Sequence, residues 1–331
     1  MPRRGRPSRA AVYDRLDLQI GSLRERLGGL PSPVEADEIW RGIWLEEAHH
    51  STAIEGNTLV LRQVEVLLAE GRAVGNRELS EYLEVRGYAD AASWVYGHGI
   101  QAGEWTDGDL ISLAEVRHIH VLAMTPVWDV APHPQGSEQE GPGSFRRHDV
   151  RPFPAGMRPP DWNEVPPLVG DWLKAAGTLR PDEPRIAEAL ATVHARFEQI
   201  HPFLDGNGRT GRLVLNLLLV RLGYPPAIIY KGDRSRYLAA LRRADEGDPG
   251  PLGELVARAV LDNLYKFVVP AVAGPARLVP LPALATNQLS ANALRVAAVR
   301  GRLKAGRAAD GSWRSSRVWV DEYVAGRYKR G

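Results

Sequence analysis

One stretch of the chain, from His201 to Arg212, brings together an imidazole, a carboxylate, an amide, three glycines and two guanidinium groups. The run Gly206-Asn207-Gly208 leaves its backbone N–H groups open to close approach. It precedes an apolar run, residues 213–220, which predicts a buried helix that begins at this loop. Unpaired amides and the helix dipole both favour phosphate at such a helix N-terminus.

The charged residues of this stretch extend the prediction. Arg209 and Arg212 are three residues apart, so on a helix they share a face and suit contact with phosphate oxygens. Asp205 offers a hard carboxylate oxygen that could hold Mg²⁺ bridging those phosphates. His201, with an ordinary pKa of ~6.5, could accept a hydroxyl proton. The stretch therefore predicts a phosphate site with a metal carboxylate and a general base.

The composition is that of a globular protein: 331 residues, 44% hydrophobic and 25% charged, allow one large domain or two smaller ones. The absence of cysteine excludes disulfides and thiolate metal sites. No apolar run approaches the ~18 residues of a membrane span, and the basic N-terminus lacks the apolar region of a secretory signal. We expect a cytoplasmic protein without membrane contact.

Apolar periodicity predicts a mainly α fold, because strand signals are nearly absent apart from residues 227–230. His194 lies on the apolar face of one expected helix and is interpreted as a packed histidine. The expected helices cover residues 11–30, 34–72 with a break at 56–57, 79–98, 109–124, 164–176, 183–200, 210–222, 233–245 and 252–269.

A stretch rich in Pro and Gly, residues 125–167, interrupts the helical pattern. A loop of this length in a compact domain is usually functional or disordered. Its middle, residues 143–150, predicts a short hairpin or an extended edge that could pair with a peptide.

The C-terminal part differs in charge from the rest. From residue 277 onward there are 11 Lys or Arg and three acidic residues, a net charge of +8, so the total of +2 leaves −6 for residues 1–276. Prolines in residues 271–282 indicate a linker. Residues 283–331 follow a helix, helix, hairpin, helix pattern, with a turn at 308–311, that is typical of a winged helix-turn-helix and predicts DNA binding. The alternative is a basic module that docks a substrate or partner protein.

The stretch from His201 to Arg212 resembles the signature of Fic-domain proteins, His-x-Phe-x-Asp/Glu-Gly-Asn-Gly-Arg-x-x-Arg, at every defined position. The resemblance covers residues 105–270 as the catalytic core. Upstream, Ser51-Thr-Ala-Ile-Glu55-Gly56 is similar to the family's inhibitory motif, which places an inhibitory helix in the N-terminal region, residues 1–104.

Fic proteins are mostly AMP transferases, so the resemblance implies transfer of AMP from ATP to a Ser, Thr or Tyr hydroxyl of a target protein, with release of pyrophosphate. It assigns the deprotonation of the target hydroxyl to His201 and Mg²⁺ binding to Asp205. The implied phosphate contacts are Asn207 for the α-phosphate, the amides of Gly206 and Gly208, Arg209 for the β-phosphate and Arg212 for the γ-phosphate.

The resemblance also implies a switch and two further contacts. A carboxylate of Glu55 that pairs with Arg212 would remove the γ-phosphate partner and keep the enzyme inactive. The family's flap, a hairpin that holds the target segment, corresponds to Gly143, Phe145 and Arg146, with Phe145 as an apolar clamp. Tyr237 stands where relatives have an aromatic residue near adenine, and Phe203 is expected to anchor the loop in the core.

Several alternatives stay open at the level of sequence. The same glutamate supports removal of AMP in some relatives, and others transfer a different group from a nucleotide. The basic C-terminal part also allows a DNA-associated regulator whose Fic site senses nucleotide. The target protein is not revealed, and neither is a homodimer that could hold the inhibitory helix in place.

Overall fold

The computed structural model describes residues 7–33, 36–100, 105–106, 108–152, 157–272, 278–307 and 311–327. These residues are mainly helical, which confirms the predicted fold class. The helices are α1 (Arg9–Leu27), α2 (Asp37–Glu55), α3 (Leu61–Glu70), α4 (Leu79–Gly99), α5 (Leu113–Trp128), η2 (Trp162–Glu164), α6 (Val165–Gly177), α7 (Ile186–Ile200), α8 (Asn207–Arg221), η3 (Lys231–Asp233), α9 (Arg234–Asp245), α10 (Gly250–Asn263), η4 (Leu264–Val268), α11 (Val269–Val272), η5 (Leu281–Leu284), α12 (Ala291–Val299) and α13 (Arg317–Arg327). The strands are β1 (Val279–Pro280), β2 (Gly306–Arg307) and β3 (Trp313–Ser315).

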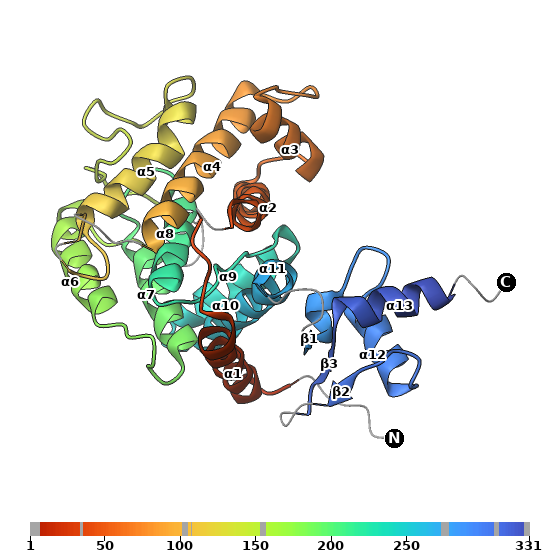
Figure 1. Ribbon diagram of the computed structural model, residues 1–331. Helices are drawn as coiled ribbons and strands as arrows, with labels where there is room; N and C mark the ends of the chain where they lie inside the picture. Colours follow the sequence, from red (N-terminus) through yellow and green to blue (C-terminus); the bar gives the residue numbers. More distant parts are fainter. Residues whose placement is uncertain are drawn as a thin grey trace.

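Helix α8 runs through the centre of the helical body and is buried along nearly its whole length (Figure 1). Its apolar run, residues 213–220, has no polar face, and such a helix is stable only when neighbours cover it on all sides. Helices α2, α4, α5 and α7 pack against it. The N-terminus of α8, which carries the predicted phosphate loop, is therefore fixed by the core.

Helix α2 is held against α4 and α8 by a buried carboxylate, Glu47. Tyr88 Oη donates to Glu47 Oε1 at 2.7 Å, Asn216 Nδ2 donates to the same oxygen at 2.7 Å, and Tyr96 donates to Oε2. Burial raises the pKa of Glu47. Because residues four apart share a helix face, this anchor also turns Ser51 and Glu55 toward the N-terminus of α8.

The proline-rich loop between α5 and η2, residues 129–161, forms turns, and its described residues contain no strand. Contacts of Arg146 hold the loop in this conformation. Its buried guanidinium donates from Nε to the carbonyl of His201 at 2.9 Å and from Nη2 to the carbonyl of Pro160 at 2.5 Å. The backbone N–H of Arg146 donates to the carbonyl of Pro202 at 3.0 Å. The predicted flap at residues 143–150 is thus a braced loop rather than a strand-paired hairpin.

The C-terminal module, residues 279–327, holds a three-stranded antiparallel sheet in the order β1-β3-β2 together with α12 and α13. It lies at one end of the molecule, beyond α11 (Figure 1). Val279 pairs with Ser315, so part of the predicted linker of residues 271–282 belongs to the sheet. The middle of that linker, residues 273–277, and most of the predicted turn at 308–311 lie outside the described residues.

Two local predictions are corrected by polar contacts. Residues 227–230 form no strand, because the backbone N–H of Ala227 donates to Asn216 Oδ1 at 2.7 Å. The helix expected from residue 109 begins at Leu113, where Ser112 caps it by accepting from the backbone N–H of Glu115 at 3.2 Å. None of the described helices combines the length and apolar character needed to cross a membrane.

We predict that Glu47→Ala lowers the free energy of unfolding by about 2–4 kcal/mol, because two tyrosine hydroxyls and one amide lose their buried partner. Thermal unfolding followed by circular dichroism measures the effect. Glu65→Ala, at a partly exposed position of α3 where it pairs with Arg62, is the control and should change the midpoint little. Equal losses in the two variants would contradict the anchoring role of Glu47.

Candidate active site

The loop before α8 is closed by the side chain of Asn207. Its Oδ1 accepts from the backbone N–H of Phe203 at 2.9 Å, and its Nδ2 donates to the carbonyl of Phe203 at 2.8 Å. Gly206 has a left-handed φ of 76°, and a Cβ there would come within 2.4 Å of Met124 Sδ. Phe203 is buried in the core, as predicted. The amide predicted to position the α-phosphate therefore braces the loop in this structure.

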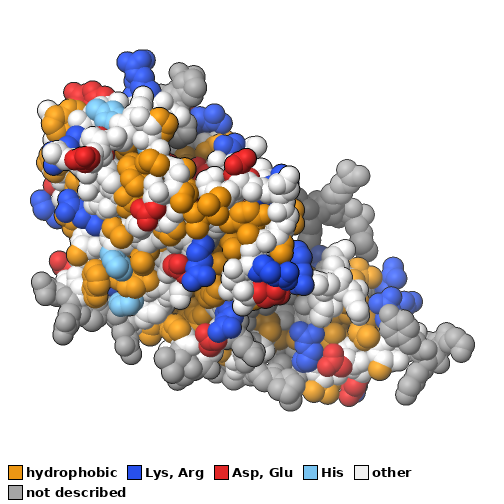
Figure 2. Space-filling view, turned by 90° about the horizontal axis from the view of Figure 1, so that it is seen from above, with side chains coloured by type: hydrophobic (Ala, Val, Ile, Leu, Met, Phe, Trp, Pro, Cys, Tyr) orange, Lys and Arg blue, Asp and Glu red, His pale blue; other side chains and the backbone are white. Residues whose placement is uncertain are grey.

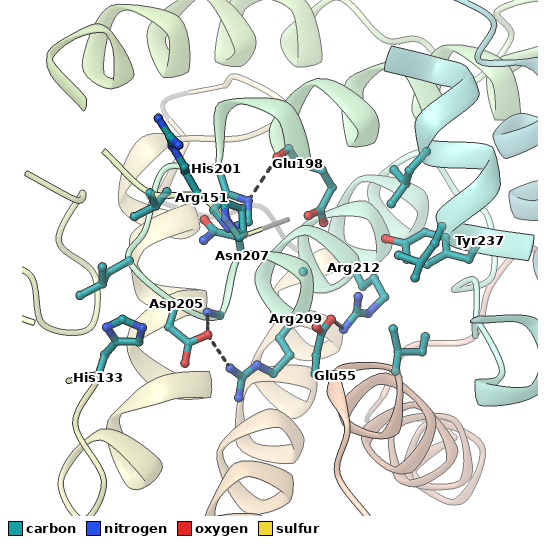
Figure 3. Close-up of a pocket in the computed structure, with 18 of the residues that line it drawn as sticks. Glu55, His133, Arg151, Glu198, His201, Asp205, Asn207, Arg209, Arg212 and Tyr237 are labelled. Carbon is teal, nitrogen blue, oxygen red and sulfur yellow. Dashed lines mark hydrogen bonds and ion pairs between the residues drawn. The ribbon is translucent and has the colours of Figure 1, made fainter. Parts of the chain in front are cut away.

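A cavity of about 430 Å³ opens above this loop, a size suited to a small ligand or nucleotide. Figure 3 shows the predicted loop residues meeting Glu55 from α2 and Tyr237 from α9 around it. Its lining includes Ile54, Glu55, His133, Gln135, Val150, Arg151, Pro152, Glu198, His201, Leu204, Asp205, Gly206, Asn207, Gly208, Arg209, Arg212, Arg234, Tyr237, Leu238 and Leu241.

His201 ends α7 in a left-handed conformation, with φ 49°, which turns its ring toward the cavity. Its Nδ1 lies 3.3 Å from the carbonyl oxygen of Glu198. If Nδ1 carries the proton and donates to that carbonyl, the lone pair is at Nε2. Burial lowers the pKa of His201 to about 4. The imidazole is therefore neutral at pH 7 and able to accept a proton.

Asp205 and Arg209 form the polar edge of the cavity. Asp205 Oδ1 accepts from the backbone N–H of Gly206 at 2.6 Å and from Arg209 Nη2 at 3.2 Å, and Arg209 also pairs with Glu84. Burial alone would raise the pKa of Asp205, but the guanidinium and the amide lower it. Its side chain is 48% exposed, so the carboxylate is ionised and accessible.

The residues present fit a divalent cation that is shared with a ligand. The described residues contain no group of three or more Asp, Glu, His or Cys placed to hold a metal. Mg²⁺ commonly binds through one or two carboxylates, with phosphates and waters as its other ligands. Asp205, at the rim of a cavity that also holds a helix N-terminus, has the position that this arrangement requires.

The guanidinium of Arg212 is buried and held by the last turn of α2. Its Nε donates to Ser51 Oγ at 2.7 Å, and its Nη2 donates to the carbonyl of Ser51 at 3.0 Å and to Glu55 Oε1 at 2.7 Å. Burial would raise the pKa of Glu55, yet Arg212 lowers it. Gly56 ends α2 in a left-handed conformation, with φ 115°. The predicted contact between Glu55 and Arg212 is thus present in the structure.

Gly208 makes room for this ion pair. A Cβ at Gly208 would lie 2.5 Å from Glu55 Oε1 and 3.0 Å from Arg212 Nη1. The absence of a side chain at Gly208 therefore lets the carboxylate of Glu55 reach Arg212 at the predicted phosphate site.

Residues 110–219 match the model of the Fic/DOC family. These residues form a Fic/DOC domain. The chain is 33% identical to a protein adenylyltransferase Fic of Drosophila willistoni over 259 residues, which is 75% of this chain and 47% of that protein. It is 34% identical over 220 residues to the protein of the same name from Drosophila melanogaster, which is 65% of this chain and 40% of that protein. The chain thus spans about half the length of the curated relatives it matches.

Solved structures agree with the fold. Fic-1 from C. elegans superimposes with a TM-score of 0.62 at 25% identity, covering 78% of this chain and 72% of that one. A Fic family protein from Desulfovibrio desulfuricans superimposes with a TM-score of 0.56 at 22% identity and covers 96% of this chain and 98% of that one. The fold similarity to the second protein extends over nearly the whole chain.

Tyr237 lines the cavity of the Fic/DOC domain, but its side chain is buried and packs against neighbouring residues. Its side chain is buried, its hydroxyl donates to His194 Nε2 at 2.8 Å, and its ring centre lies 6.0 Å from Arg212 Cζ. His194 is packed and hydrogen-bonded, as predicted. Leu238 and Leu241 line the cavity next to Tyr237, where the adenine contact was predicted.

Of the predicted flap, Gly143, Phe145 and Arg146 lie beside the cavity, whereas Val150 at its end is part of the lining. Phe145 packs against Phe203, with ring centres 5.8 Å apart, and under the guanidinium of Arg117. The backbone N–H of Gly143 donates to His120 Nδ1 at 2.7 Å. From this loop, the described residues that line the cavity are His133, Gln135 and residues 150–152. The apolar clamp predicted at Phe145 is therefore a packing contact here.

Sequence reasoning missed Glu198, which lies on α7 and lines the cavity (Figure 3). Burial raises its pKa to about 7, although Arg212 opposes the shift. A signal was present in the sequence, because Ala187, Ala191, His194 and Glu198 share one face of the helix. A carboxylate on an otherwise buried face marks a functional or paired group.

We predict that Glu198→Gln stabilises the protein in a pH-dependent way. The folded state keeps a proton on Glu198 up to pH about 7, whereas the unfolded chain loses it near its ordinary pKa of 4.5. Wild-type stability is therefore penalised as pH rises through this window, and the variant should gain up to about 3 kcal/mol at pH 8 with no such gain at pH 4.5. Thermal melts at the two pH values measure this, with Glu70→Gln on α3 as the exposed control. A difference that is independent of pH would contradict the assignment.

Proposed function

We propose that this chain is a protein adenylyltransferase, which moves AMP from ATP to a Ser, Thr or Tyr hydroxyl of a target protein, and that Glu55 keeps it inactive at rest. The observation that carries the proposal is the capture of Arg212 by Glu55 at the edge of a cavity that also holds His201 and Asp205. The names of the curated relatives, which are protein adenylyltransferases, support the reaction.

The proposed reaction uses the cavity as follows. His201 accepts the proton of the target hydroxyl, whose oxygen attacks the α-phosphorus of ATP, and the bond from that phosphorus to the bridging oxygen breaks to release pyrophosphate. The amides of Gly206 and Gly208, with Arg209 and Arg212, neutralise the phosphate charge. Asp205 would hold Mg²⁺, which neutralises charge on the phosphates when bound.

Inhibition follows from the chemistry of one buried guanidinium. Arg212 is buried, so its charge requires an anionic or strongly accepting partner. In this structure the partners are Ser51 and Glu55, and in the active state the partner would be the γ-phosphate. The proposal also includes residues 105–270 as the catalytic core and a cytoplasmic location, both expected from the sequence, and a homodimer that could hold the inhibitory helix in place. Removal of AMP by the same site stays an alternative outcome.

We predict that Glu55→Gly increases AMP transfer about 10- to 100-fold, because a charge-assisted contact of ~1.5–3 kcal/mol no longer competes with phosphate. Incorporation of α-labelled ATP into the protein itself and into lysate proteins measures the effect. Glu70→Gly is a matched control, because Glu70 also ends a helix before a glycine. Labelling must disappear in Glu55→Gly/His201→Ala. Equal labelling of wild type and Glu55→Gly would refute autoinhibition.

A second function is favoured by the surface of the C-terminal module. The exposed face of α12 carries Asn292, Arg295, Val296 and Val299, and Arg307 is exposed on the neighbouring β2. Asn and Arg side chains pair with base edges, and apolar groups contact the methyl group of thymine. Figure 2 shows basic, acidic and apolar side chains together on the face of this module that is in view. We therefore propose double-stranded DNA as a partner of α12 and docking to a protein as the alternative.

We predict that the full-length protein binds a DNA duplex at 50 mM salt and that affinity falls steeply by 200 mM salt. Fluorescence anisotropy of a labelled duplex measures the Kd at each of the two salt concentrations. Arg295→Ala should weaken binding about tenfold, whereas Arg62→Ala, at an exposed position of α3, should change it little. The absence of binding at 50 mM salt would favour a protein-docking module instead.

A further inference from the structure

One carboxyl group in the cavity has no task in the proposed reaction. Glu198 lies three residues before His201, and its side chain is 13% exposed. Its Oε1 is buried and has no hydrogen-bond partner among the described residues, with His194 Nε2 at 3.9 Å. A Cβ at Gly211 would lie 2.3 Å from this oxygen, so the carboxyl rests against the second turn of α8. An unpartnered buried oxygen of this kind is costly unless a ligand supplies the missing partner.

The position of Glu198 in the cavity indicates which part of a ligand it meets. The phosphate end is formed by Asp205, residues 206–208 and Arg209, where amides and charges collect. Tyr237 of α9 lies away from Asp205 in Figure 3, and the neighbouring Leu238 and Leu241 also line the cavity and suit the face of a base. Figure 3 shows Glu198 descending from α7 between His201 and Tyr237, on the path from one end to the other.

We infer that Glu198 recognises the ribose of the bound nucleotide by hydrogen bonding to a ribose hydroxyl. The inference rests on the proposed function, because it requires a nucleotide with its phosphates at the α8 N-terminus. A ribose joins phosphate to base and must therefore lie between the two ends of the cavity. Carboxylates are common acceptors for ribose hydroxyls in nucleotide sites.

The groups that surround Glu198 suit this role. Arg212 from α8, Glu55 from α2 and Asp245 from α9 are the charged groups that influence it, and His194 and Tyr237 are its neutral neighbours. Arg212 is engaged by Glu55 and Ser51 in this structure and by the γ-phosphate in the proposed active state, which leaves the carboxyl of Glu198 for a ligand hydroxyl. Its pKa of about 7 means that protonated and ionised forms are both available near neutral pH. The group can then donate to or accept from a hydroxyl.

The test compares nucleotides that differ only in the ribose. Isothermal titration calorimetry gives the Kd of ATP, 2′-deoxyATP and 3′-deoxyATP for full-length Glu55→Gly protein, in which Arg212 is released. We expect ATP to bind about tenfold more tightly than at least one deoxy analogue, since one lost hydrogen bond of ~1.4 kcal/mol corresponds to that ratio. Adding Glu198→Ala should bring the ratio close to one, and adding Glu198→Gln should retain part of it, because the amide also bonds to hydroxyls.

The outcomes separate the inference from the proposed function. A ratio that is the same with and without Glu198→Ala, or a ratio near one in the parent protein, would overturn ribose recognition while ATP binding still supported the proposed function. Folded parent protein that binds none of the three nucleotides would overturn both. Circular dichroism establishes that each variant is folded. If Glu198→Ala does not fold, Glu198→Gln takes its place. A Kd ratio of deoxy analogue to ATP that is reduced in Glu198→Gln then supports the inference. A ratio equal to that of the parent protein refutes it.

Discussion

The arrangement of the cavity depends on which anion pairs with the buried guanidinium of Arg212. Arg212 projects from the first turns of α8 into the wall of the cavity and has almost no contact with solvent. A charge in that position must be paired, and the available anions are a carboxylate of the protein or a phosphate of a ligand. In the structure the carboxylate of Glu55 occupies the place. Under the proposed function, activation would be the exchange of this carboxylate for the γ-phosphate at the same guanidinium.

Other contacts of the helical body fix the positions of Glu55 and His201 around the cavity. Glu47 fixes α2 two turns before Glu55 through contacts to α4 and α8, so the carboxylate arrives at one defined point. Gly208 leaves the space that the carboxylate occupies. Arg146 ties the proline-rich loop to the carbonyl of His201, which holds the imidazole near the same cavity. Rigid supports of this kind are the usual basis of precise positioning in a site.

The sequence predicted which side chains lie together at the cavity better than it predicted the contacts that support them. The spacing from His201 to Arg212 predicted which side chains would meet, because a loop and a helix N-terminus place them locally. The link from Glu55 to Arg212 followed from a family resemblance, and the structure contains it. The buried contacts of Arg146 to the carbonyls of His201 and Pro160 depend on backbone groups brought together by folding, which no local pattern encodes. Residues 143–150, expected as a short hairpin or an extended edge, form turns without a strand for the same reason.

The central claim, that Glu55 and the terminal phosphate of ATP compete for Arg212, is tested most directly by nucleotide binding. Calorimetry should compare wild type with Glu55→Gly for ATP and for AMP, which lacks the terminal phosphates. We predict that the substitution tightens ATP binding about tenfold and changes AMP binding less than about twofold. An equal change for both nucleotides, or no change for ATP, would contradict the competition.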